Sequence, residues 1–491
     1  MKKIGAYSIA ILSVLFYFAN ASAFTTVCGD VSGTWDVSGS PYLVECDVNI
    51  QAGQVLIIDP DVTVMLYDNT SINVYGQMIA TGTKSQHITF QAVASDRKWN
   101  RIYISPSSAT PPVNQFNYCD FLNAETALYI NIRGKIDNDW TIMNVFITDS
   151  YFSDSVNTAI YGEAIAVDAS QFMSPRRRHA RLDPTIERNV FDGNNNGIEL
   201  YSQGVCNSWC SGATSEPIVR SNMFIGITDA SFNMLNGPLQ SASVPLFVNN
   251  TVINSGKGVV IVDPFETEIK NNIFKGNTIA VEKASPTLGT VHYNLFYDNV
   301  SDCLTCPSSF GDTFLLNRNG DPSDIGSNIF MDPLLVSDIS PYSTVDSPTK
   351  NAGTADYAPD SDIDFNARPQ EVYIDIGANE VCEFDADNDG ICDSGDNCAF
   401  VTNPSQKDTN NDGNGDVCQC GDMNGDGLVT NTDAVLIQRN LLGLSSPFDP
   451  DLCDVNGDGN CTNTDAVIIK RAELGLPPGV NQSCAATMPA Q

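Results

Sequence analysis

Short apolar runs separated by polar and turn-forming residues fill the first part of the chain. Between residues 45 and 100, the runs QVLIID, VTVML, INVYG and HITFQ are divided by Gly, Pro, Asp and Asn. Runs of this length, rich in Val, Ile and Phe and bounded by turn residues, are typical of β-strands. Because no helical periodicity competes with them, the pattern predicts a region built mainly of short strands.

A looser repeat follows this region. It reads RNVFDGN, SNMFIGI, NNTVINS, NNIFKGN and YNLFYDN, and its marker residues are Asn189, Asn222, Asn250, Asn272 and Asn294. Successive markers lie 33, 28, 22 and 22 residues apart. A repeat of roughly 20 to 30 residues made of short strands predicts a solenoid whose coils stack on one another. The fold class we expect is therefore mainly β, a parallel β-helix, with a β-sandwich with irregular loops as the alternative.

The repeat also predicts how each coil is built. We expect the apolar pair of each repeat to face the shared interior. The asparagine is expected to lie at a turn, where it tolerates the left-handed conformation and bonds its stacked neighbour through its amide.

The N-terminus has the pattern of an export signal. Two lysines at 2–3 precede an apolar run over 8–19, and the small residues ASA follow at 21–23. The apolar run is too short to span a bilayer comfortably. We therefore expect residues 1–23 to be a signal peptide and the remaining chain to be secreted, extracellular or associated with the cell surface, without a transmembrane segment.

Charge narrows the range of partners. The chain has 59 acidic and 25 basic residues, which gives a formal net charge of −34. Nucleic acids and anionic membrane surfaces are poor partners for such a negative field. The acid is concentrated at the end, because 18 Asp and Glu face only 4 Lys and Arg from residue 382 onward. This part of the chain therefore needs cations.

Fifteen cysteines in an exported chain indicate disulfides. Pairs that are close in the sequence can staple loops or close an end, and the candidates are Cys28 with Cys46, Cys206 with Cys210, and Cys303 with Cys306. Because the count is odd, at least one thiol stays free, and Cys119 in the strand-like FNYCDFLNA is the expected buried thiol.

Aspartates recur at alternate positions after the β-rich region. In DADNDGICDSGD, a glycine at the sixth position allows the sharp turn around which oxygen ligands can enclose calcium. A disordered acidic tail is the alternative, but the regular spacing and the cysteines favour calcium. The expected ligands are Asp385, Asp387, Asp389, Asp393 and Asp396, and in the following DTNNDGNGD they are Asp408, Asn410, Asp412 and Asp416.

Two near-copies of one segment follow, GDMNGDGLVTNTDAVLIQR and CDVNGDGNCTNTDAVIIKR. Each has the ligand spacing of an EF-hand loop, with Asp in place of Glu at the twelfth position. The expected ligands are Asp422, Asn424, Asp426, the Leu428 carbonyl, Thr430 through water and Asp433, and in the second copy Asp454, Asn456, Asp458, the Asn460 carbonyl, Thr462 and Asp465.

A helix is expected after each loop. Its apolar side is predicted to consist of Val435, Ile437, Leu441 and Leu442 in the first copy, and of Val467, Ile468, Ile469 and Leu474 in the second.

One basic stretch, MSPRRRHARLDPTIER, is the only candidate for catalysis that the sequence offers. Its candidate residues are Arg176, Arg178, His179 and Arg181. Arginines on a groove can grip the carboxylates of an acidic polysaccharide, and in a lyase one of them can remove the proton next to a neutralised uronate. The alternative, which we favour, is a solvated loop insertion between coils whose arginines pair with local acids.

Three family resemblances accompany these patterns. The segment VNIQAGQVLIIDPDVTVMLYDNTSINVYGQMIATGT resembles the opening coils of right-handed parallel β-helix proteins, and DIDFNARPQEVYIDIGANE resembles the closing segment of secreted β-helix proteins. The acidic block with DNC, NPSQ and GDVC resembles thrombospondin type 3 repeats. The duplicated loop-helix pair resembles a type I dockerin, a small α-helical module.

The resemblances imply an organisation into five parts. These are the signal peptide 1–23, a right-handed parallel β-helix over 24–380, thrombospondin type 3-like repeats over 381–420, a dockerin-like domain over 421–479 and a tail over 480–491. A dockerin implies a folded, calcium-bound module that docks to a cohesin in either of two orientations. The implied partner contacts are Asn431, Thr432, Arg439, Asn463, Thr464, Lys470 and Arg471.

We therefore expect a secreted, calcium-binding modular protein. Its β-helix is expected to bind or degrade a polysaccharide, and its dockerin to dock to a cohesin-bearing partner. If the chain is an enzyme, a polysaccharide lyase or an O-glycosyl hydrolase is expected. The alternative is a non-catalytic surface, adhesion or structural protein whose C-terminal module is a calcium-stabilised cap.

Overall fold

The computed structural model describes most of the first 381 residues and parts of the C-terminal region. The described ranges are 24–137, 139–168, 177–206, 210–236, 244–262, 267–285, 289–337, 339–381, 384, 386, 393, 396–399, 403, 415, 421–424, 429–444, 450–456 and 460–473. The expected signal peptide, residues 1–23, lies outside them.

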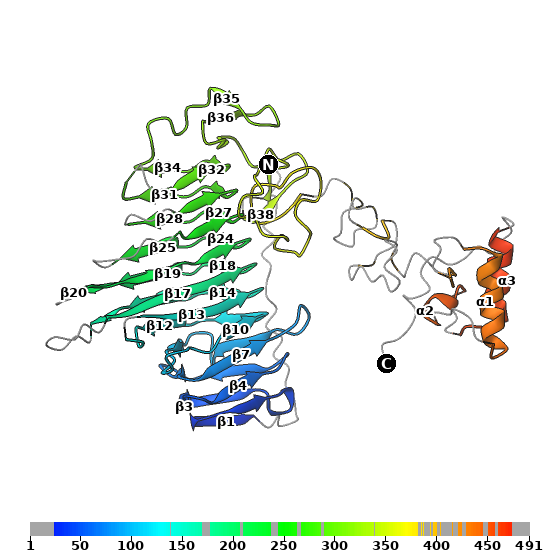
Figure 1. Ribbon diagram of the computed structural model, residues 1–491, viewed down its shortest axis with the longest axis horizontal. Coiled ribbons are helices and arrows are strands. Elements are labelled where there is room, and N and C mark those ends of the chain that lie inside the picture. Colours follow the sequence, from blue (N-terminus) through cyan, green and yellow to red (C-terminus); the bar gives the residue numbers. More distant parts are fainter. Residues whose placement is uncertain are drawn as a thin grey trace, which may run out of the picture.

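Three stacks of parallel strands wind around one core (Figure 1). Each coil gives one strand to each stack in turn, and every strand pairs in register with the equivalent strand of the next coil, as β27, β30 and β33 do. We call the outer surfaces of the stacks face one, face two and face three. Face one consists of β2 (Gly33–Trp35), β4 (Val55–Ile58), β7 (Gln77–Thr81), β10 (Asn114–Asn117), β13 (Asp139–Thr148), β17 (Arg177–Glu187), β23 (Ile218–Arg220), β26 (Leu246–Val248), β29 (Glu268–Lys270) and β32 (Thr290–His292).

The other two stacks begin on β3 (Tyr42–Ile50), which pairs with β1 (Thr25–Asp30) and turns a corner to serve both. Face two continues with β5 (Thr63–Leu66), β8 (Ile88–Ala92), β11 (Cys119–Leu122), β14 (Tyr151–Ser153), β18 (Val190–Asp192), β24 (Met223–Ile225), β27 (Thr251–Ile253), β30 (Ile273–Lys275) and β33 (Leu295–Tyr297). Face three continues with β6 (Ser71–Val74), β9 (Arg101–Ile104), β12 (Thr126–Arg133), β15 (Thr158–Ile165), β19 (Asn196–Gln203), β25 (Ala230–Asn236), β28 (Lys257–Ile261), β31 (Ile279–Lys283) and β34 (Ser301–Leu304).

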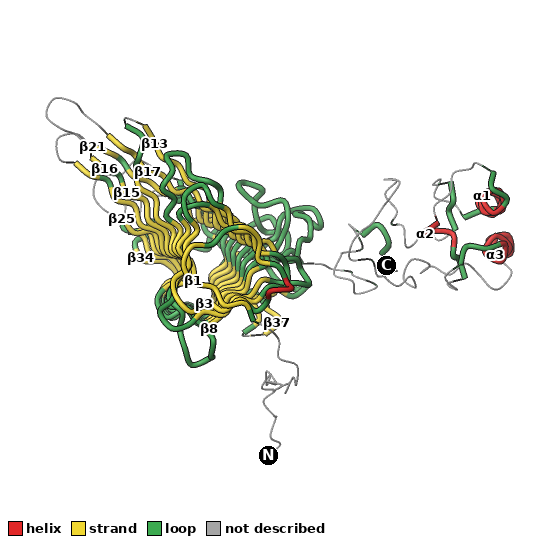
Figure 2. The backbone as a smooth tube through the Cα atoms, turned by 90° about the horizontal axis from the view of Figure 1, so that it is seen from below, coloured by secondary structure: helices red, strands yellow, loops and turns green. Residues whose placement is uncertain are grey.

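This arrangement is a parallel β-solenoid. The predicted parallel β-helix is therefore confirmed, and the sandwich alternative is wrong. Figure 2 shows the stacked coils from below, with the longest strands reaching beyond the others. Short elements complete the described part, namely η1 (Val37–Gly39), β16 (Val167–Asp168), β20 (Val205–Cys206), β21 (Cys210–Ser211), β22 (Ala213–Ser215), β35 (Leu315–Leu316), β36 (Pro322–Ser323), β37 (Leu335–Ser337) and β38 (Ser340–Ser343).

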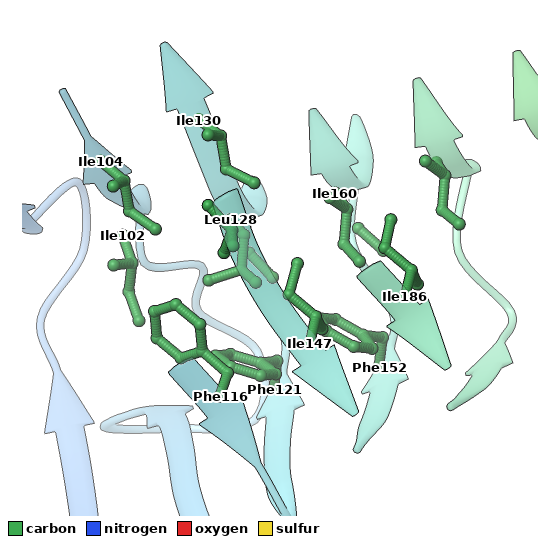
Figure 3. Close-up of a cluster of buried hydrophobic side chains, with 14 of the residues drawn as sticks. Ile102, Ile104, Phe116, Phe121, Leu128, Ile130, Ile147, Phe152, Ile160 and Ile186 are labelled. Carbon is green, nitrogen blue, oxygen red and sulfur yellow. The ribbon is translucent and has the colours of Figure 1, made fainter. Parts of the chain in front are cut away.

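Stacked phenylalanines form the centre of the solenoid. Alternate side chains of a strand point inward, so equivalent residues of successive coils meet in the interior, as Figure 3 shows for Phe121 and Phe152 among isoleucines. Ring centroids are 4.7–5.1 Å apart along the first part of this stack. The stack contains Phe90, Phe121, Phe152, Phe191 and Phe224 and resumes with Phe274, Phe296 and Phe330. The second residue of each apolar pair, such as Phe274, therefore faces the shared interior as expected. The expectation is wrong for the first residue, such as Ile273, which points to the other side of the strand and packs with Ala352 and Ile376 of the closing segment.

The repeated asparagines form a buried ladder at the corner between faces one and two. The backbone N–H of Asn250 donates to Oδ1 of Asn272 at 2.8 Å, and that of Asn272 donates to Oδ1 of Asn294 at 2.9 Å. The expected stacking bond is present. The left-handed conformation, however, belongs to the preceding residue of each repeat, such as Asn271 at φ 55°. The preceding residue makes the turn, which leaves the ladder amide free to bond the next coil.

Disulfides staple both ends of the solenoid. As expected, Cys28 on β1 forms a disulfide with Cys46 on β3, and Cys303 on β34 forms one with Cys306, which follows this strand. In the described part of the chain, Cys119 is a buried free thiol, which confirms that prediction. The Cys206 and Cys210 backbones pair across β20 and β21, and their side chains are outside the described part.

After the last coil the chain returns along the corner between faces one and two. We call residues 340–381 the closing segment. Asn249 Nδ2 donates to the Asp375 carbonyl at 3.0 Å, and the Ala378 N–H donates to Thr251 Oγ1 at 3.0 Å. The segment is held internally by an ion pair between Arg368 and Glu380, whose side chains are both fully buried.

Near the C-terminus, α1 (Asn431–Leu441) and α3 (Asn463–Glu473) pack on each other, with α2 (Pro450–Cys453) beside them. Ala434 and Ile437 of α1 meet Ala466 and Ile469 of α3 in a small core. The expectation for the apolar sides was partly wrong, because Val435, Leu441, Leu442 and Val467 are exposed. A disulfide joins Cys453 and Cys461 across the second loop. Leu474 lies outside the described residues.

None of the helices in the described part of the chain has the length and apolarity of a membrane span.

Candidate functional site

The last acidic residue of each duplicated loop lies at the start of the following helix. Thr430 is the N-cap of α1 and accepts from the Thr432 N–H, while Asp433 Oδ2 accepts from the Thr430 N–H at 2.8 Å, which completes a capping box. The other Asp433 oxygen accepts from the Met423 N–H at 2.9 Å. Asp433 therefore ties the beginning of the loop to the helix.

The second loop repeats this arrangement. Asp465 Oδ2 accepts from the Thr462 N–H at 2.9 Å, and its Oδ1 accepts from the Asn456 N–H at 3.2 Å. The equivalent bond in the first loop joins the Asn424 N–H to Asp433 Oδ1. The two copies therefore share geometry as well as sequence.

The donor set fits calcium. Asp422, Asp433, Asp454 and Asp465 are all at most 6% exposed, and buried carboxylates are expensive unless they are paired or bind a metal. Aspartate, asparagine and threonine oxygens at alternate loop positions are the hard ligands that calcium prefers. The expected ligands Asp426, Leu428 and Asp458 lie outside the described residues. Among the described residues no three acidic, His or Cys side chains gather into one metal-binding group.

The preceding acidic block is described only in part. The Ala386 N–H donates to Asp393 Oδ1 at 2.8 Å, and the Cys398 N–H donates to Asp396 Oδ1 at 2.7 Å. These carboxylates therefore close short turns in the first loop. The other expected ligands of this block lie outside the described residues, and they are Asp385, Asp387, Asp389, Asp408, Asn410, Asp412 and Asp416.

An exposed stripe runs along each of the two helices. On α1 it contains Thr432, Val435, Arg439 and Leu442, which are all exposed and follow one another at helical spacing. Thr464, Val467 and Arg471 occupy the equivalent positions on α3. Val435 and Val467 are 41% and 43% exposed. The stripes unite most of the expected partner contacts and add the apolar residues that sequence reasoning had placed in the core.

One pair of residues beside the stripes differs between the two copies. Gln438 Nε2 donates to Asn463 Oδ1 at 2.8 Å, and Lys470 Nζ donates to Gln438 Oε1 at 2.9 Å. Gln438 and Lys470 occupy equivalent positions in the two copies, so these bonds have no symmetric counterpart. Asn463 is therefore engaged within the module, which distinguishes it from its counterpart Asn431.

The basic stretch of the β-helix forms a strand. From Arg177 onward it is β17, the longest strand of face one, so the expected loop insertion is wrong for these residues. The expected pairing with local acids is present, because Arg178 Nε contacts Asp137 Oδ1 at 2.6 Å. The His179 ring stacks on Trp140 with centroids 4.7 Å apart. Arg176 lies outside the described residues.

Arg181 lines an open groove of about 340 Å³ on face one. Its guanidinium contacts Asp183 Oδ2 at 2.7 Å and Glu216 Oε2 at 3.4 Å. Two carboxylates therefore surround one cation. The groove also contains Asn144 and the apolar side chain of Leu246. Because Arg178 and Arg181 already hold carboxylates, the gripping of an acidic polysaccharide by these residues stays a prediction.

Face three carries a row of tyrosines that the sequence did not reveal. Tyr103, Tyr129 and Tyr161 occupy one outward column, with ring centroids 5.3 and 4.8 Å apart. The Arg101 guanidinium lies over the Tyr129 ring at 4.9 Å. All three tyrosines are half-buried. The column is therefore an outward aromatic surface that crosses three coils.

Two glutamates adjoin the end of this row. In the pairing of β15 with β19, Tyr161 lies opposite Glu199, and Glu163 lies opposite Tyr201. Glu163 Oε2 accepts from Asn131 Nδ2 at 2.6 Å and from the Tyr129 hydroxyl at 3.1 Å. Burial raises the pKa of Glu199, and a hydrogen bond from Asn233 partly counteracts this shift. Burial and the charge of Glu163 raise the pKa of Tyr129 to about 12.

The two glutamates have different environments. Glu163 accepts hydrogen bonds from two donors, whereas desolvation raises the pKa of Glu199. We call these residues, with the tyrosine row, the glutamate–tyrosine site. The sequence offered no signal for it, because its residues come from coils of unequal length.

The duplicated loops, the buried acids and the exposed stripes define a paired calcium-binding loop-helix module on a chain that also contains a parallel β-solenoid. Residues 420–472 match the model of the dockerin type I domain, and residues 379–406 match that of the thrombospondin type 3 repeat. Both are calcium-binding domains, and dockerin domains bind cohesin. No curated protein matches the chain. The resemblances to a type I dockerin and to thrombospondin type 3 repeats are thus confirmed.

These matches support calcium binding and docking to a cohesin-bearing partner. Proteins that carry dockerins are typically extracellular or attached to the cell surface.

Proposed function

We propose that the β-helix hydrolyses a polysaccharide at the glutamate–tyrosine site and that the dockerin carries it to a cohesin-bearing partner. The observation that carries the proposal is the pair of glutamates with unlike environments beside a row of outward tyrosines. Glycoside hydrolysis needs one carboxylic acid to protonate the leaving oxygen and one carboxylate to activate water or attack the sugar.

Each glutamate takes one of these roles. Glu199, whose pKa burial raises, is the general acid. Glu163, which accepts from Asn131 and Tyr129, is the carboxylate. The two lie diagonally on neighbouring strands, so strand spacing and a two-residue advance put their Cβ atoms roughly 8 Å apart. Two glutamates at this Cβ spacing can place their carboxyl groups on either side of a glycosidic bond.

The tyrosine row supplies the sugar contacts. Tyrosines combine an apolar ring with a polar hydroxyl and therefore suit a substrate with both hydroxyl groups and apolar C–H faces. The row runs across the strands from Tyr103 to Tyr161, so a chain-like substrate can contact several coils. No lysine or arginine is paired with the two glutamates on β15 and β19, and the Arg101 guanidinium of the row lies over the Tyr103 and Tyr129 rings. We therefore infer a neutral polysaccharide.

The test is an activity panel with matched variants of the full chain. Neutral and uronic-acid polysaccharides are incubated with the protein, and both reducing ends and unsaturated products are measured. Glu163→Gln and Glu199→Gln are each expected to lower the rate at least 100-fold, since general acid–base catalysis contributes about 10²–10⁴-fold. Glu282→Gln is the control, because Glu282 faces outward on β31 of the same stack and pairs with Lys257.

The outcomes separate the possible functions. Unsaturated products that depend on Arg178 and His179 would replace hydrolysis by a lyase reaction at the basic strand. No product from any polysaccharide would favour the second candidate, a non-catalytic surface or adhesion protein. The pairing of Arg178 and Arg181 with local acids favours that candidate, because protein carboxylates already balance the charge of these two arginines.

Docking is tested separately from catalysis. The full chain is expected to bind an immobilised type I cohesin in calcium and to be released by a chelator. A chain that folds with calcium yet binds none of a panel of type I cohesins would indicate a calcium-stabilised cap instead.

A further inference from the structure

A small cavity lies at the end of the solenoid, far from the glutamate–tyrosine site in the coil order. Its volume is about 110 Å³. One water needs roughly 10–15 Å³ of such space, so a ligand of several heavy atoms fits. Its polar lining includes Lys283, Thr290, His292, Ser309 and Asp324.

Lys283 is the unusual residue of this cavity. It is the last residue of β31, and only 5% of it is exposed. An ammonium has three donors. In the described part of the chain, the acceptor for Lys283 Nζ is the Gly289 carbonyl, at 3.2 Å. A buried charge with one neutral acceptor is costly. The chain has a net charge of −34 and is therefore rich in carboxylates, yet the described acceptor of Lys283 is a neutral carbonyl.

The nearby carboxylates are engaged elsewhere. Asp324 accepts from the Gly326 and Asn328 N–H groups at 2.8 and 3.0 Å and from the Gly311 N–H at 3.2 Å. Glu268 contacts Lys270 Nζ at 2.9 Å and accepts from the Thr290 hydroxyl. Both acids therefore serve other donors, and Lys283 has no ion pair among the described residues.

We propose that this cavity binds a small carboxylate anion, whose charge pairs with the Lys283 ammonium. Ser309 adds a hydroxyl donor, and His292 lies at the mouth, where it is exposed. Phe310, Val291 and Ile325 give the cavity apolar walls. Such walls suit a compact organic anion better than a phosphate, which needs several donors at once.

The charges around the cavity support this assignment. Desolvation lowers the pKa of Lys283, and partial desolvation at the cavity mouth, together with the charges of Lys270 and Lys283, lowers the pKa of His292. A bound anion would reverse the first shift by stabilising the charged lysine. Asp324 and Glu268 act in the opposite direction on His292.

The cavity is built on rigid elements. One wall of the cavity, formed by Pro307, Ser309 and Phe310, directly follows the Cys303–Cys306 disulfide in the sequence. Phe310 packs edge-on against Phe296 and Phe330, with ring centroids 5.3 and 5.4 Å apart. On the floor, a Cβ added to Gly326 would lie 2.8 Å from the His292 ring and 2.9 Å from the Val291 carbonyl. Backbone and ring therefore approach as closely as a glycine allows.

The experiment is calorimetric titration of the full chain with acetate, glucuronate, glucose and inorganic phosphate. Saturable binding of either carboxylate, with a rise in Tm, is expected for the natural chain. Lys283→Met is expected to weaken this binding at least tenfold, while Lys257→Met, on the neighbouring strand of the same stack, leaves it unchanged. Binding of acetate and glucuronate alike would show that the carboxylate alone is recognised, whereas glucuronate alone would show that the sugar ring contributes.

A second variant guards against a folding defect. Ser309→Trp places a bulky ring at the mouth from a half-exposed loop position and leaves Lys283 in place. It is expected to block binding without lowering Tm. The proposal is overturned if the natural chain binds neither carboxylate, if Lys283→Met binds as tightly as the natural chain, or if phosphate binds and carboxylates do not. Because the readout is binding, its failure leaves the proposed hydrolysis untouched.

Discussion

The side-chain amide of each ladder asparagine bonds atoms of two different coils. Asn272 accepts from the Asn250 N–H and side-chain amide of the preceding coil at 2.8 and 3.1 Å. It donates to the Phe247 carbonyl of that coil at 2.8 Å and to Asn294 Oδ1 of the next coil at 2.9 Å. These groups lie in the interior, where water cannot replace the bonds. One residue type thus performs, at a turn, the pairing that strands perform elsewhere.

Asn272→Ala should therefore be costly. Each buried group left without a partner costs about 1–3 kcal/mol, so the midpoint of denaturant unfolding should fall clearly. Asn195→Ala is the control, since its amide makes a single 3.4 Å bond at a partly exposed position, and surface changes of this kind stay within about 0.5 kcal/mol. Equal losses in both variants would contradict the ladder's role.

The proposed hydrolysis has a pH dependence that follows from Glu199. A general acid must be protonated, so kcat/KM should fall as pH rises through the raised pKa of this residue. The hydrogen bond from Asn233 lowers that pKa. Asn233→Ala should consequently move the alkaline limb of the pH profile to higher pH, whereas Glu282→Gln should leave it in place. A limb that moves to lower pH, or none that titrates, would rule out Glu199 as the acid.

At the scale of elements, the two stripes of the dockerin share Thr, Val and Arg at equivalent positions, whereas the neighbouring residues Gln438 and Lys470 differ. Two equivalent docking faces predict that loss of one costs about a factor of two in affinity, since one of two orientations remains. The second face must first release Asn463 from Gln438, at about 1 kcal/mol for one hydrogen bond. The first face should therefore be preferred.

This preference is measurable with paired changes. Substituting Asn431 and Thr432 by aspartate should weaken cohesin binding more than the same change at Asn463 and Thr464, and only the fourfold variant should abolish it. Gln438→Ala should remove the difference between the two double variants. Complete loss from either double variant alone would show that a single orientation is used.

The coils of the solenoid and the calcium module could be predicted from the sequence, whereas the glutamate–tyrosine site could not. Asn272 and its counterparts marked each coil, and the loop spacing from Asp422 to Asp433 marked the calcium module, because both patterns are local. The glutamate–tyrosine site was not predictable. Tyr129, Tyr161 and Glu199 meet only after insertions of unequal length are taken up outside the stack, so their register cannot be read from the sequence.

The basic strand shows a second limit. Arg178 and Arg181 suggested an anion site because two of their partners, Asp137 and Glu216, lie on neighbouring coils and are distant in the sequence. Val435 was assigned to the apolar side of α1 by its hydropathy, whereas Ala434 and Ile437 face the core and Val435 is exposed. In both cases the surroundings, and not the residue type, decide the role.

At the scale of the whole molecule, the chain has two sources of stability. The solenoid has a continuous hydrophobic core, whereas the C-terminal module has a small core and buried acids that need a cation. Metal–ligand energy supplies folding energy in such modules. A chelator should therefore abolish the helical circular dichroism of α1 and α3 and leave the β-sheet signal intact.

The control is the return of calcium, which should restore the helical signal. Asp433→Ala combined with Asp465→Ala should reproduce the chelated spectrum in the presence of calcium. A helical signal that survives chelation would show that the module's own core is sufficient.

The closing segment determines which contacts of the solenoid form last during synthesis. Most contacts between coils join residues some 22 to 40 positions apart, as Asn250 and Asn272 do, so they can form while synthesis continues. Ser221, by contrast, bonds the Ser361 carbonyl 140 residues later, and Asn249 waits 126 residues for the Asp375 carbonyl. The corner of these coils thus stays uncovered until the closing segment has been synthesised. A nascent chain that stops before the closing segment has a solenoid whose corner between faces one and two is uncovered. The calcium module is synthesised after the closing segment.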